Sequence, residues 1–254
     1  MSYYNPRLIG GSLDSGLIPK TGLALFLGTL LALACAGVAV GYAFFGPSDV
    51  VERIKLATVW IIVDGDTQGS GVIVREDGYV LTAAHVVKGG KCGEVIAVFK
   101  SGQKDAEKIA ATCTEHVGTP AGPHPSEIGK DYALLKLEAD HPLPTLPVIG
   151  SDQVTEGTRV FVAGFPLGEE LAQSYYGPNV RVEPGHVTTV MRGGEQGAIA
   201  FNTDARTVQG MSGGPCTTDR GEVVGIISMG SENAATYLTL PTSRFRHVWE
   251  PLKK

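Results

Sequence analysis

Three short segments carry residues whose types suit acyl transfer by a serine nucleophile. His85 follows small residues after an apolar run, Asp131 directly precedes another apolar run, and Ser212 lies among glycines in Gly210–Pro215. A serine hydroxyl needs a neighbouring base to take its proton. A neutral imidazole suits that role, and a carboxylate on its second ring nitrogen fixes the tautomer. We therefore expect His85, Asp131 and Ser212 to form a catalytic triad.

The glycines around Ser212 have a separate expected role. Without Cβ atoms a turn can direct successive backbone N–H groups at one point, where they would stabilise the oxyanion of a tetrahedral intermediate. We assign this oxyanion hole to the amides of Gly210 and Ser212. Each motif alone has a common structural explanation, as a surface histidine, a turn aspartate or a flexible loop. The combination of the three favours the catalytic interpretation.

The composition argues against several other classes of function. The 254-residue chain has 21 Lys and Arg against 26 Asp and Glu, a formal net charge of −5. A protein that binds duplex nucleic acid needs a basic surface instead, so we expect no nucleic-acid partner. The four cysteines contain no C-x-x-C pair and no metal-ligand constellation is visible. We expect neither a metal nor a cofactor.

The distribution of apolar residues predicts an all-β body. Short apolar runs separated by Gly, Pro and Asp are typical of antiparallel barrels or a sandwich, and no long stretch of helical period supports a parallel βαβ sheet. Asp140–Pro147 holds three prolines and divides the body into halves. Thr242–Trp249 is the one helix that we expect in residues 49–254. The runs are Thr58–Val63, Gly71–Val74, Tyr79–Thr82, Val95–Phe99, Tyr132–Leu137, Val160–Ala163, His186–Val190, Ile199–Thr203, Val223–Ser228 and Tyr237–Leu240.

An uncharged segment near the N-terminus predicts one transmembrane helix. Leu23–Phe45 is almost entirely apolar, and at ~1.5 Å per residue it spans roughly 35 Å, enough for a hydrocarbon core of about 30 Å. We expect a cytoplasmic tail over residues 1–21, a transmembrane helix over 22–46 and a catalytic domain that carries the triad over 49–254. Basic residues precede the span and the charges after it nearly balance, so the positive-inside rule favours an extracytoplasmic domain, periplasmic or extracellular.

Two alternatives to a retained membrane anchor stay open. A cleaved signal peptide could use Ala32-Leu33-Ala34, although the apolar run is longer than usual and continues past that site. A lipoprotein signal ending at Cys35 is weaker, because Ala32 stands where a leucine is normally expected.

Eight blocks of sequence together resemble one known family. They are Gly69–Val74, Gly78–Thr82, Ala84–Val87, Asp131–Lys136, Val162–Gly168, Thr203–Ala205, Gly210–Pro215 and Val224–Ile226. In type and order they resemble a trypsin-like (chymotrypsin-fold) serine protease of the HtrA/Deg branch, over roughly residues 57–249. The resemblance implies two antiparallel six-stranded β-barrels at about 57–140 and 150–241, a C-terminal helix at about 242–250, and a triad in the cleft between the barrels.

The same resemblance implies a function. The implied function is hydrolysis of polypeptide substrates by an endopeptidase that acts in extracytoplasmic protein quality control. A homo-oligomer is compatible with this function. HtrA/Deg proteins usually carry PDZ domains after the protease, and this sequence, which ends at Lys254, shows none. We therefore do not expect peptide sensing by a PDZ module. The residue before the serine is commonly Asn in that branch and is Met211 here.

The resemblance also suggests residues that bind substrate. Arg206 lies six positions before Ser212, where the family places the floor of the pocket for the scissile residue. An arginine floor would favour an acidic side chain; alternatively Arg206 points outward or pairs with a carboxylate, and the pocket takes small aliphatic residues. Ser228 to Gly230 match the stretch whose backbone pairs with an extended substrate as an added strand.

The cysteines leave two states open. Cys92 and Cys113 are 21 positions apart, and an oxidising compartment would allow them to bridge; two buried free thiols are the alternative. Cys216, beside the catalytic turn, is expected to pack rather than to react.

Two other functions compete with an active protease. An α/β-hydrolase also has a Gly-x-Ser-x-Gly turn, but it places its acid and histidine after the serine. The one histidine after Ser212 is His247, in the expected C-terminal helix. A pseudoprotease would be a membrane-tethered peptide-binding module that kept the barrels and lost turnover. The intact triad residues count against it.

Overall fold

The computed structural model describes residues 47–88, 92–118, 129–166, 173–174, 177–193, 197–231 and 236–253. The expected cytoplasmic tail at 1–21 and the expected transmembrane helix at 22–46 lie outside these residues. In the described ranges, every helix is too short or too polar to cross a bilayer.

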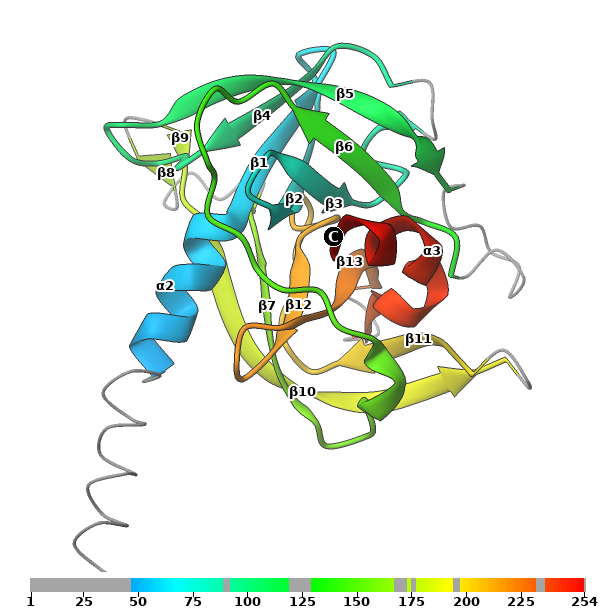
Figure 1. Ribbon diagram of the computed structural model, residues 1–254. Coiled ribbons are helices and arrows are strands. Elements are labelled where there is room, and N and C mark those ends of the chain that lie inside the picture. Colours follow the sequence, from blue (N-terminus) through cyan, green and yellow to red (C-terminus); the bar gives the residue numbers. More distant parts are fainter. Residues whose placement is uncertain are drawn as a thin grey trace, which may run out of the picture. The chain divides into compact units, whose positions relative to one another are not determined.

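The first half of the described chain forms a closed barrel of antiparallel strands (Figure 1). Val59, Ile61 and Val63 take alternate positions in the first strand, and all three are buried in the core of this barrel, as the period of two in a strand requires. The strands pair in the order β1-β2-β3-β6-β5-β4, and β4 closes onto β1. They are β1 Thr58–Val63, β2 Thr67–Arg75, β3 Tyr79–Thr82, β4 Val95–Phe99, β5 Glu107–Val117 and β6 Ala133–Leu137.

The second half forms another closed antiparallel barrel, in the order β10-β11-β14-β13-β12-β7. Its strands are β7 Arg159–Gly164, β10 Arg181–Arg192, β11 Ala198–Thr203, β12 Pro215–Thr218, β13 Val223–Ser231 and β14 Thr236–Pro241. A separate pair, β8 Gln173–Ser174 and β9 Gly177–Pro178, forms a two-stranded sheet. Two closed barrels of six strands each confirm the expected all-β class.

A cluster of buried apolar residues joins the two barrels. Leu81 and Leu134 of the first barrel and Ala163 and Ile226 of the second belong to one contiguous core, and each is at most 1% exposed. Full burial of such aliphatic side chains contributes about 1.5–3 kcal/mol each. The barrels are therefore held together by packing in addition to the chain that connects them.

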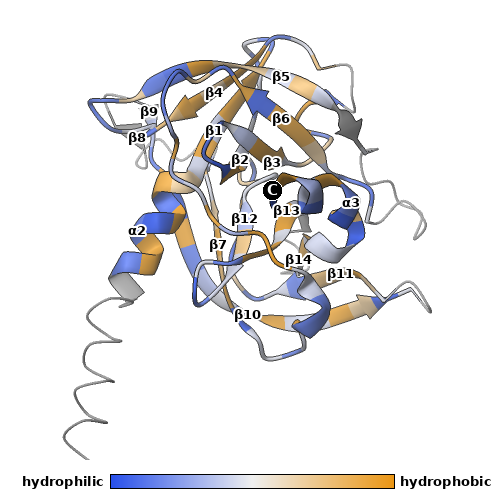
Figure 2. Cartoon of the chain, in the orientation of Figure 1, coloured by the Kyte–Doolittle hydropathy of each residue, from blue (hydrophilic) through white to orange (hydrophobic). Residues whose placement is uncertain are grey.

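One helix of the described chain was not expected. The expectation of a single helix in residues 49–254 is wrong, because α2 occupies Pro47–Ala57 and leads directly into β1. Val50, Ile54 and Ala57 are buried in the cluster between the barrels, at the spacing that places residues on one helical face. Figure 2 shows the resulting bands of hydrophobic and hydrophilic residues along α2. In the sequence α2 directly follows the long apolar run Leu23–Phe45, so its amphipathic pattern is hard to distinguish from that run.

The C-terminal segment is helical, as expected, but in three short pieces. A 3-10 helix η6 at Thr242–Phe245 is followed by α3 at Arg246–Trp249 and a 3-10 helix η7 at Glu250–Lys253. Phe245 and Trp249 are buried in the cluster between the barrels. The indole Nε1 of Trp249 donates a hydrogen bond to the Thr242 carbonyl at 2.8 Å. This segment therefore covers the junction of the barrels.

A disulfide joins Cys92 to Cys113, with their Cα atoms 6.1 Å apart. Cys92 lies just before β4 and Cys113 lies in β5, which pairs with β4. Of the two states that the sequence left open, the structure has the bridged one.

We predict that replacing both Cys92 and Cys113 by alanine lowers the free energy of unfolding by about 3 kcal/mol, because a cross-link spanning 21 positions reduces the entropy of the unfolded chain. Urea denaturation under oxidising conditions measures the change. As a control, reducing agent should bring the wild type to the stability of the double variant and leave that variant unchanged. Equal stability of the two oxidised proteins would contradict the prediction.

Candidate active site

The pairing of two strands brings His85 and Asp131 together. Thr82 at the end of β3 lies opposite Ala133 at the start of β6, so the turn after β3 meets the residue before β6. His85 Nδ1 lies 2.8 Å from Asp131 Oδ2, and the His85 amide donates to Asp131 Oδ1 at 2.9 Å. The Asp131 side chain is 1% exposed, whereas that of His85 is 38% exposed. The imidazole therefore has one buried edge and one edge towards solvent.

The buried carboxylate of Asp131 has a third donor that the sequence did not predict. The hydroxyl of Ser228, on β13 of the second barrel, donates to Asp131 Oδ2 at 2.5 Å. A buried carboxylate is tolerated only when donors replace its water, and bonds to an ionised acceptor are the strong ones. The Asp131 carboxylate beside Nδ1 favours the tautomer of His85 that carries its proton on Nδ1, which leaves Nε2 as a proton acceptor. The sequence had indicated Ser228 only for its main chain.

The C-terminal segment holds Tyr132, the residue that follows Asp131. Its ring stacks on Phe245 with centroids 5.2 Å apart, and its hydroxyl lies 3.3 Å from His247 Nε2. Burial raises the pKa of Tyr132, against a smaller lowering by the charge of Arg244, so the phenol stays neutral at neutral pH. The residue next to Asp131 is therefore fixed in place by the segment that covers the barrel junction.

The loop that carries Ser212 leaves two backbone amides without a partner in the described chain. The amides of Met211, Gly213 and Gly214 donate to backbone carbonyls at 2.7–3.1 Å. Those of Gly210 and Ser212 donate to no described residue. Buried backbone donors are rarely left unpaired, and a pair of free N–H groups flanking a nucleophile is what an oxyanion hole requires. The oxyanion-hole roles of Gly210 and Ser212 stay predictions, and these two unpaired amides support them.

Gly213 shows why the loop needs glycine. Its φ is +83°, and a Cβ atom there would lie 2.2 Å from both the Ser70 carbonyl and the Thr82 hydroxyl. A side chain at Gly213 would thus face both an unfavourable backbone conformation and a collision with the first barrel. The nucleophile loop can lie against β2 and β3 only because this position has no side chain.

The Ser212 hydroxyl is not hydrogen-bonded to the histidine in the structure. Ser212 Oγ donates to the Ser228 carbonyl at 3.3 Å, and no bond links it to His85 within the described residues. The two segments are nevertheless neighbours, because a Cβ atom at Gly69 would lie 2.6 Å from Val86 and 3.2 Å from the Ser212 carbonyl. Rotation about the Ser212 side-chain torsion changes the acceptor of its hydroxyl without moving the backbone, and such contacts often form only with substrate bound.

The residues expected to bind substrate are Arg206, whose side chain was expected at the pocket floor, and Ser228 and Gly230, whose backbone was expected to pair with substrate. The side chain of Arg206 is exposed, which favours the interpretation in which it points outward over the one in which it floors a pocket. Ser228 and Gly230 lie on β13, where β12 pairs only as far as Ile226 and β14 pairs on the other side. Among the described strands, the stretch from Ser228 therefore has one open edge for an added strand.

Cys216 is unsuited to covalent chemistry, as expected. It is fully buried (0% exposed), and this burial raises the pKa of its thiol to about 12, with a small opposite effect from a hydrogen bond to Thr239. Since the thiolate is the reactive form, Cys216 acts as a packing residue.

Two closed barrels, with a histidine–aspartate pair on one and a serine loop on the other, are the features of a double-barrel serine peptidase. A family model described as "Trypsin-like peptidase domain" matches residues 69–226, more than half of the chain, so the chain belongs to this family. The similarity extends to HtrA-type proteases. The mitochondrial serine protease HTRA2 of Bos taurus is 28% identical over 215 residues, which are 78% of this chain and 41% of that protein.

Other relatives agree with this branch. Serine protease HTRA1 of Xenopus laevis is 30% identical over 78% of this chain and 41% of its own length. A probable periplasmic serine endoprotease, DegP-like, of Halomonas elongata is 29% identical over 68% of this chain and 31% of its own length. The chain spans less than half the length of these relatives. The expected trypsin-like peptidase family is confirmed, and the expected resemblance to the HtrA/Deg branch is found in these relatives.

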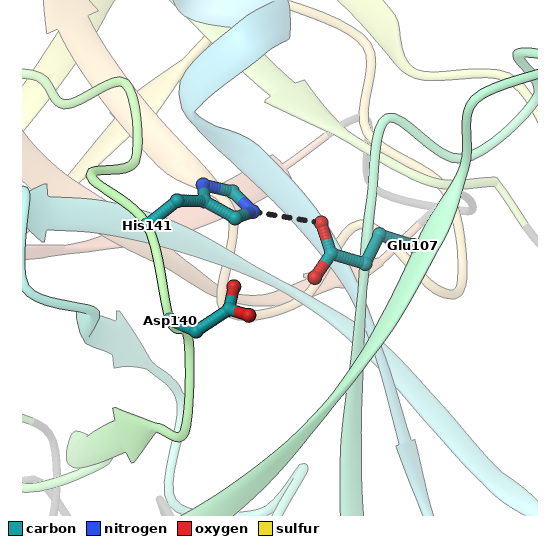
Figure 3. A group of neighbouring side chains, drawn as sticks. All are labelled: Glu107, Asp140 and His141. Carbon is teal, nitrogen blue, oxygen red and sulfur yellow. Dashed lines mark hydrogen bonds and ion pairs between the residues drawn. The ribbon is translucent and has the colours of Figure 1, made fainter.

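Away from this site, one group of side chains in the described chain has the ligand types and spacing of a metal site. Glu107, Asp140 and His141 offer ligand atoms within 4.8 Å of one another, and Figure 3 shows Glu107 facing His141. His141 Nε2 lies 2.9 Å from Glu107 Oε2, and both side chains are about two-fifths exposed, at 41% and 42%. An exposed ion pair accounts for this contact. The Glu107 carboxylate raises the pKa of His141 above its usual range, and the Pro142 carbonyl adds to the effect.

We predict that Glu107→Gln lowers the melting temperature at about pH 5.5 and leaves it unchanged at about pH 8.5. The pKa of His141 is raised on folding, so its contribution is present below the unfolded pKa of about 6.5 and is lost as pH rises through the folded value. Because the pair is exposed, the change should be no more than a few degrees. Thermal melts at both pH values measure it, with exposed Glu138→Gln as the control. An equal loss at both pH values would contradict the assignment.

Proposed function

We propose that this chain is a membrane-anchored serine endopeptidase that cleaves polypeptides through an acyl-enzyme intermediate. His85 is the general base, Asp131 orients it, and Ser212 is the nucleophile. The observation that supports this most directly is the buried Asp131 carboxylate, which holds both the ring and the amide of His85. A carboxylate in this position steadies the imidazolium that forms during the reaction.

The chemistry follows from the placement of these groups. Ser212 Oγ attacks the scissile carbonyl as its proton passes to His85 Nε2, and the oxyanion forms between the amides of Gly210 and Ser212. His85 then protonates the leaving amine, and the C–N bond breaks to give the acyl-enzyme. Water attacks this ester as His85 takes a proton from it. Collapse of the second tetrahedral intermediate releases the carboxylic acid and returns the proton to Ser212.

Substrate binding supplies a reason for Ser212 to turn towards the histidine. An extended substrate that adds to the open edge of β13 requires the carbonyl of Ser228 as an acceptor for its own N–H group. That carbonyl accepts the Ser212 hydroxyl in the structure. Substrate therefore competes with Ser212 for Ser228 and releases the hydroxyl for His85 Nε2.

The substrate class follows from main-chain recognition. Pairing through backbone groups gives affinity with little sequence choice, which suits unfolded or exported polypeptides and a role in protein quality control outside the cytoplasm. The exposure of Arg206 gives no basis for an acidic preference. The names of the relatives include a periplasmic and a mitochondrial protease, and a homo-oligomer is part of the same proposal.

We predict that wild-type protein reacts with a fluorophosphonate probe and hydrolyses an unfolded protein substrate. Ser212→Ala should abolish labelling, and either Ser212→Ala or His85→Ala should lower kcat by about 10⁴- to 10⁶-fold, because the triad acts as a unit. Labelling is measured with and without unfolded protein, since the Ser212–His85 bond is absent in the structure. His186→Ala, which removes an exposed histidine of β10, is the matched control and should retain full activity.

The experiment tests the assigned nucleophile, and it also distinguishes an active protease from a peptide-binding module. Hydrolysis that persists in Ser212→Ala would refute the assigned nucleophile. Silence of the wild type under all conditions, with an unfolded protein still bound, would instead establish the membrane-tethered binding module.

We further predict that full-length protein stays in the membrane fraction after washes with high salt and alkaline carbonate, and that a variant lacking residues 1–46 does not. The apolar run Leu23–Phe45 gives the helix enough hydrophobic length for stable insertion. N-terminal sequencing of the mature protein distinguishes the alternatives. A terminus that follows Ala34 and starts with an unmodified Cys35 would show cleavage, a lipid on that cysteine would show lipidation, and either result would refute the retained anchor.

A further inference from the structure

Ser70 connects the first barrel to the nucleophile loop. It lies in β2 and is fully buried, at 0% exposure. Its hydroxyl donates to the Gly210 carbonyl at 2.8 Å, across 140 positions of sequence. Its amide donates to the Ser212 carbonyl, also at 2.8 Å. A single residue of β2 thus binds the loop on both sides of the residue before the nucleophile.

The remaining polar groups of Ser70 are also paired. Its hydroxyl oxygen accepts the amide of Phe165, just after β7, at 2.8 Å. Its carbonyl accepts the hydroxyl of Thr82, at the end of β3, at 2.7 Å. All donors and acceptors of Ser70 are therefore used, and they bring together both barrels and the loop. A fully satisfied buried network of this kind restricts the geometry of its members.

The bonds to Gly210 and Ser212 bear on the amides expected to hold the oxyanion. The carbonyl of Gly210 belongs to the peptide before Met211, and the carbonyl of Ser212 belongs to the peptide after Ser212. The Ser212 amide lies between these two fixed peptides, and the Gly210 amide lies one peptide earlier. The amide of Met211 is itself bonded to a carbonyl. With these peptide planes held, the two unpaired N–H groups keep one orientation.

The surroundings of Ser70 leave little room for the loop to shift. A Cβ atom at Gly164 would lie 2.7 Å from Met211 and 2.9 Å from the Ser70 hydroxyl. The glycine therefore lets β7, Ser70 and the loop meet in direct contact. An alternative position of the loop would have to break these bonds and open this packing.

We propose that Ser70 is a positioning residue of the active site, whose hydroxyl holds the Gly210–Ser212 loop so that its two free amides face the developing oxyanion. This inference rests on the proposed function. It predicts that loss of the hydroxyl raises the barrier to catalysis by misplacing the amides, while ground-state binding along β13 is unaffected.

A purely structural role for Ser70 is the alternative, and the chain offers a matched control for it. Ser151 is also a buried serine, 2% exposed. Its hydroxyl donates to the Ser243 hydroxyl and accepts the Ser243 amide, at 2.9 and 3.1 Å. Like Ser70, it gives and receives one hydrogen bond, but it joins η2 Ser151–Gln153 to η6 and touches no residue of the nucleophile loop in the described chain.

The test compares full-length wild type, Ser70→Ala and Ser151→Ala with a fluorogenic peptide and with a peptidyl trifluoromethyl ketone, which binds as an oxyanion. For Ser70→Ala we expect kcat to fall by about 10- to 100-fold, KM to stay within about twofold, and affinity for the ketone to fall in parallel with kcat. Both alanine variants should lose a few degrees of melting temperature, but Ser151→Ala should retain its kcat.

Three results would overturn the inference. One is an unchanged kcat and ketone affinity in Ser70→Ala; another is an equal fall of kcat in both variants; the third is a change confined to KM. If Ser70→Ala does not fold, Ser70→Cys makes the same comparison, because it keeps the size of the side chain and donates only weakly. Ser212→Ala is measured alongside, and its activity alone tests the proposed function.

Discussion

The buried carboxylate of Asp131 is the constraint on which the rest of the site depends. A carboxylate at 1% exposure is stable only if protein donors replace its hydration shell. Two of the donors come from His85, after β3, and the third is the hydroxyl of Ser228, on β13 of the other barrel. Satisfying this one charge therefore requires both barrels to be correctly placed, and it orients the imidazole at the same time.

Packing between the barrels supplies that placement. Leu81, Leu134 and Ile226 all belong to the buried cluster that joins the barrels. Each lies within four positions of a polar residue of the site, namely His85, Asp131 and Ser228 respectively. A shift of one barrel would disturb this core and the polar contacts together. Close-packed interiors resist such shifts, so the hydrophobic interface sets the precision of the hydrogen bonds.

The sequence predicted the local features of this molecule better than the long-range ones. The bounds of β1, β3 and β4 follow from short apolar runs. The strand β5 was missed because Glu107–Val117 is largely polar or small, and β12 because it is short and begins with Pro215. Residue types pointed to the triad, since a serine among glycines is a local pattern. The hydroxyls of Ser228 and Ser70 could not be found in this way, because their partners lie 97 and 140 positions away and only strand pairing brings them close.

The nucleophile loop combines a fixed backbone with one free torsion. The amides of Met211, Gly213 and Gly214 and the carbonyls of residues 210 to 212 are bonded to β2, β13 and the loop itself. The Ser212 hydroxyl, by contrast, has a single 3.3 Å contact. Oxyanion stabilisation depends on donors that are already in position when charge develops, which requires the backbone to be rigid. Proton transfer to His85 needs only a rotation of the serine side chain. Because the two requirements fall on different bonds, the loop can be held firmly by Ser70 while its hydroxyl still exchanges one acceptor for another.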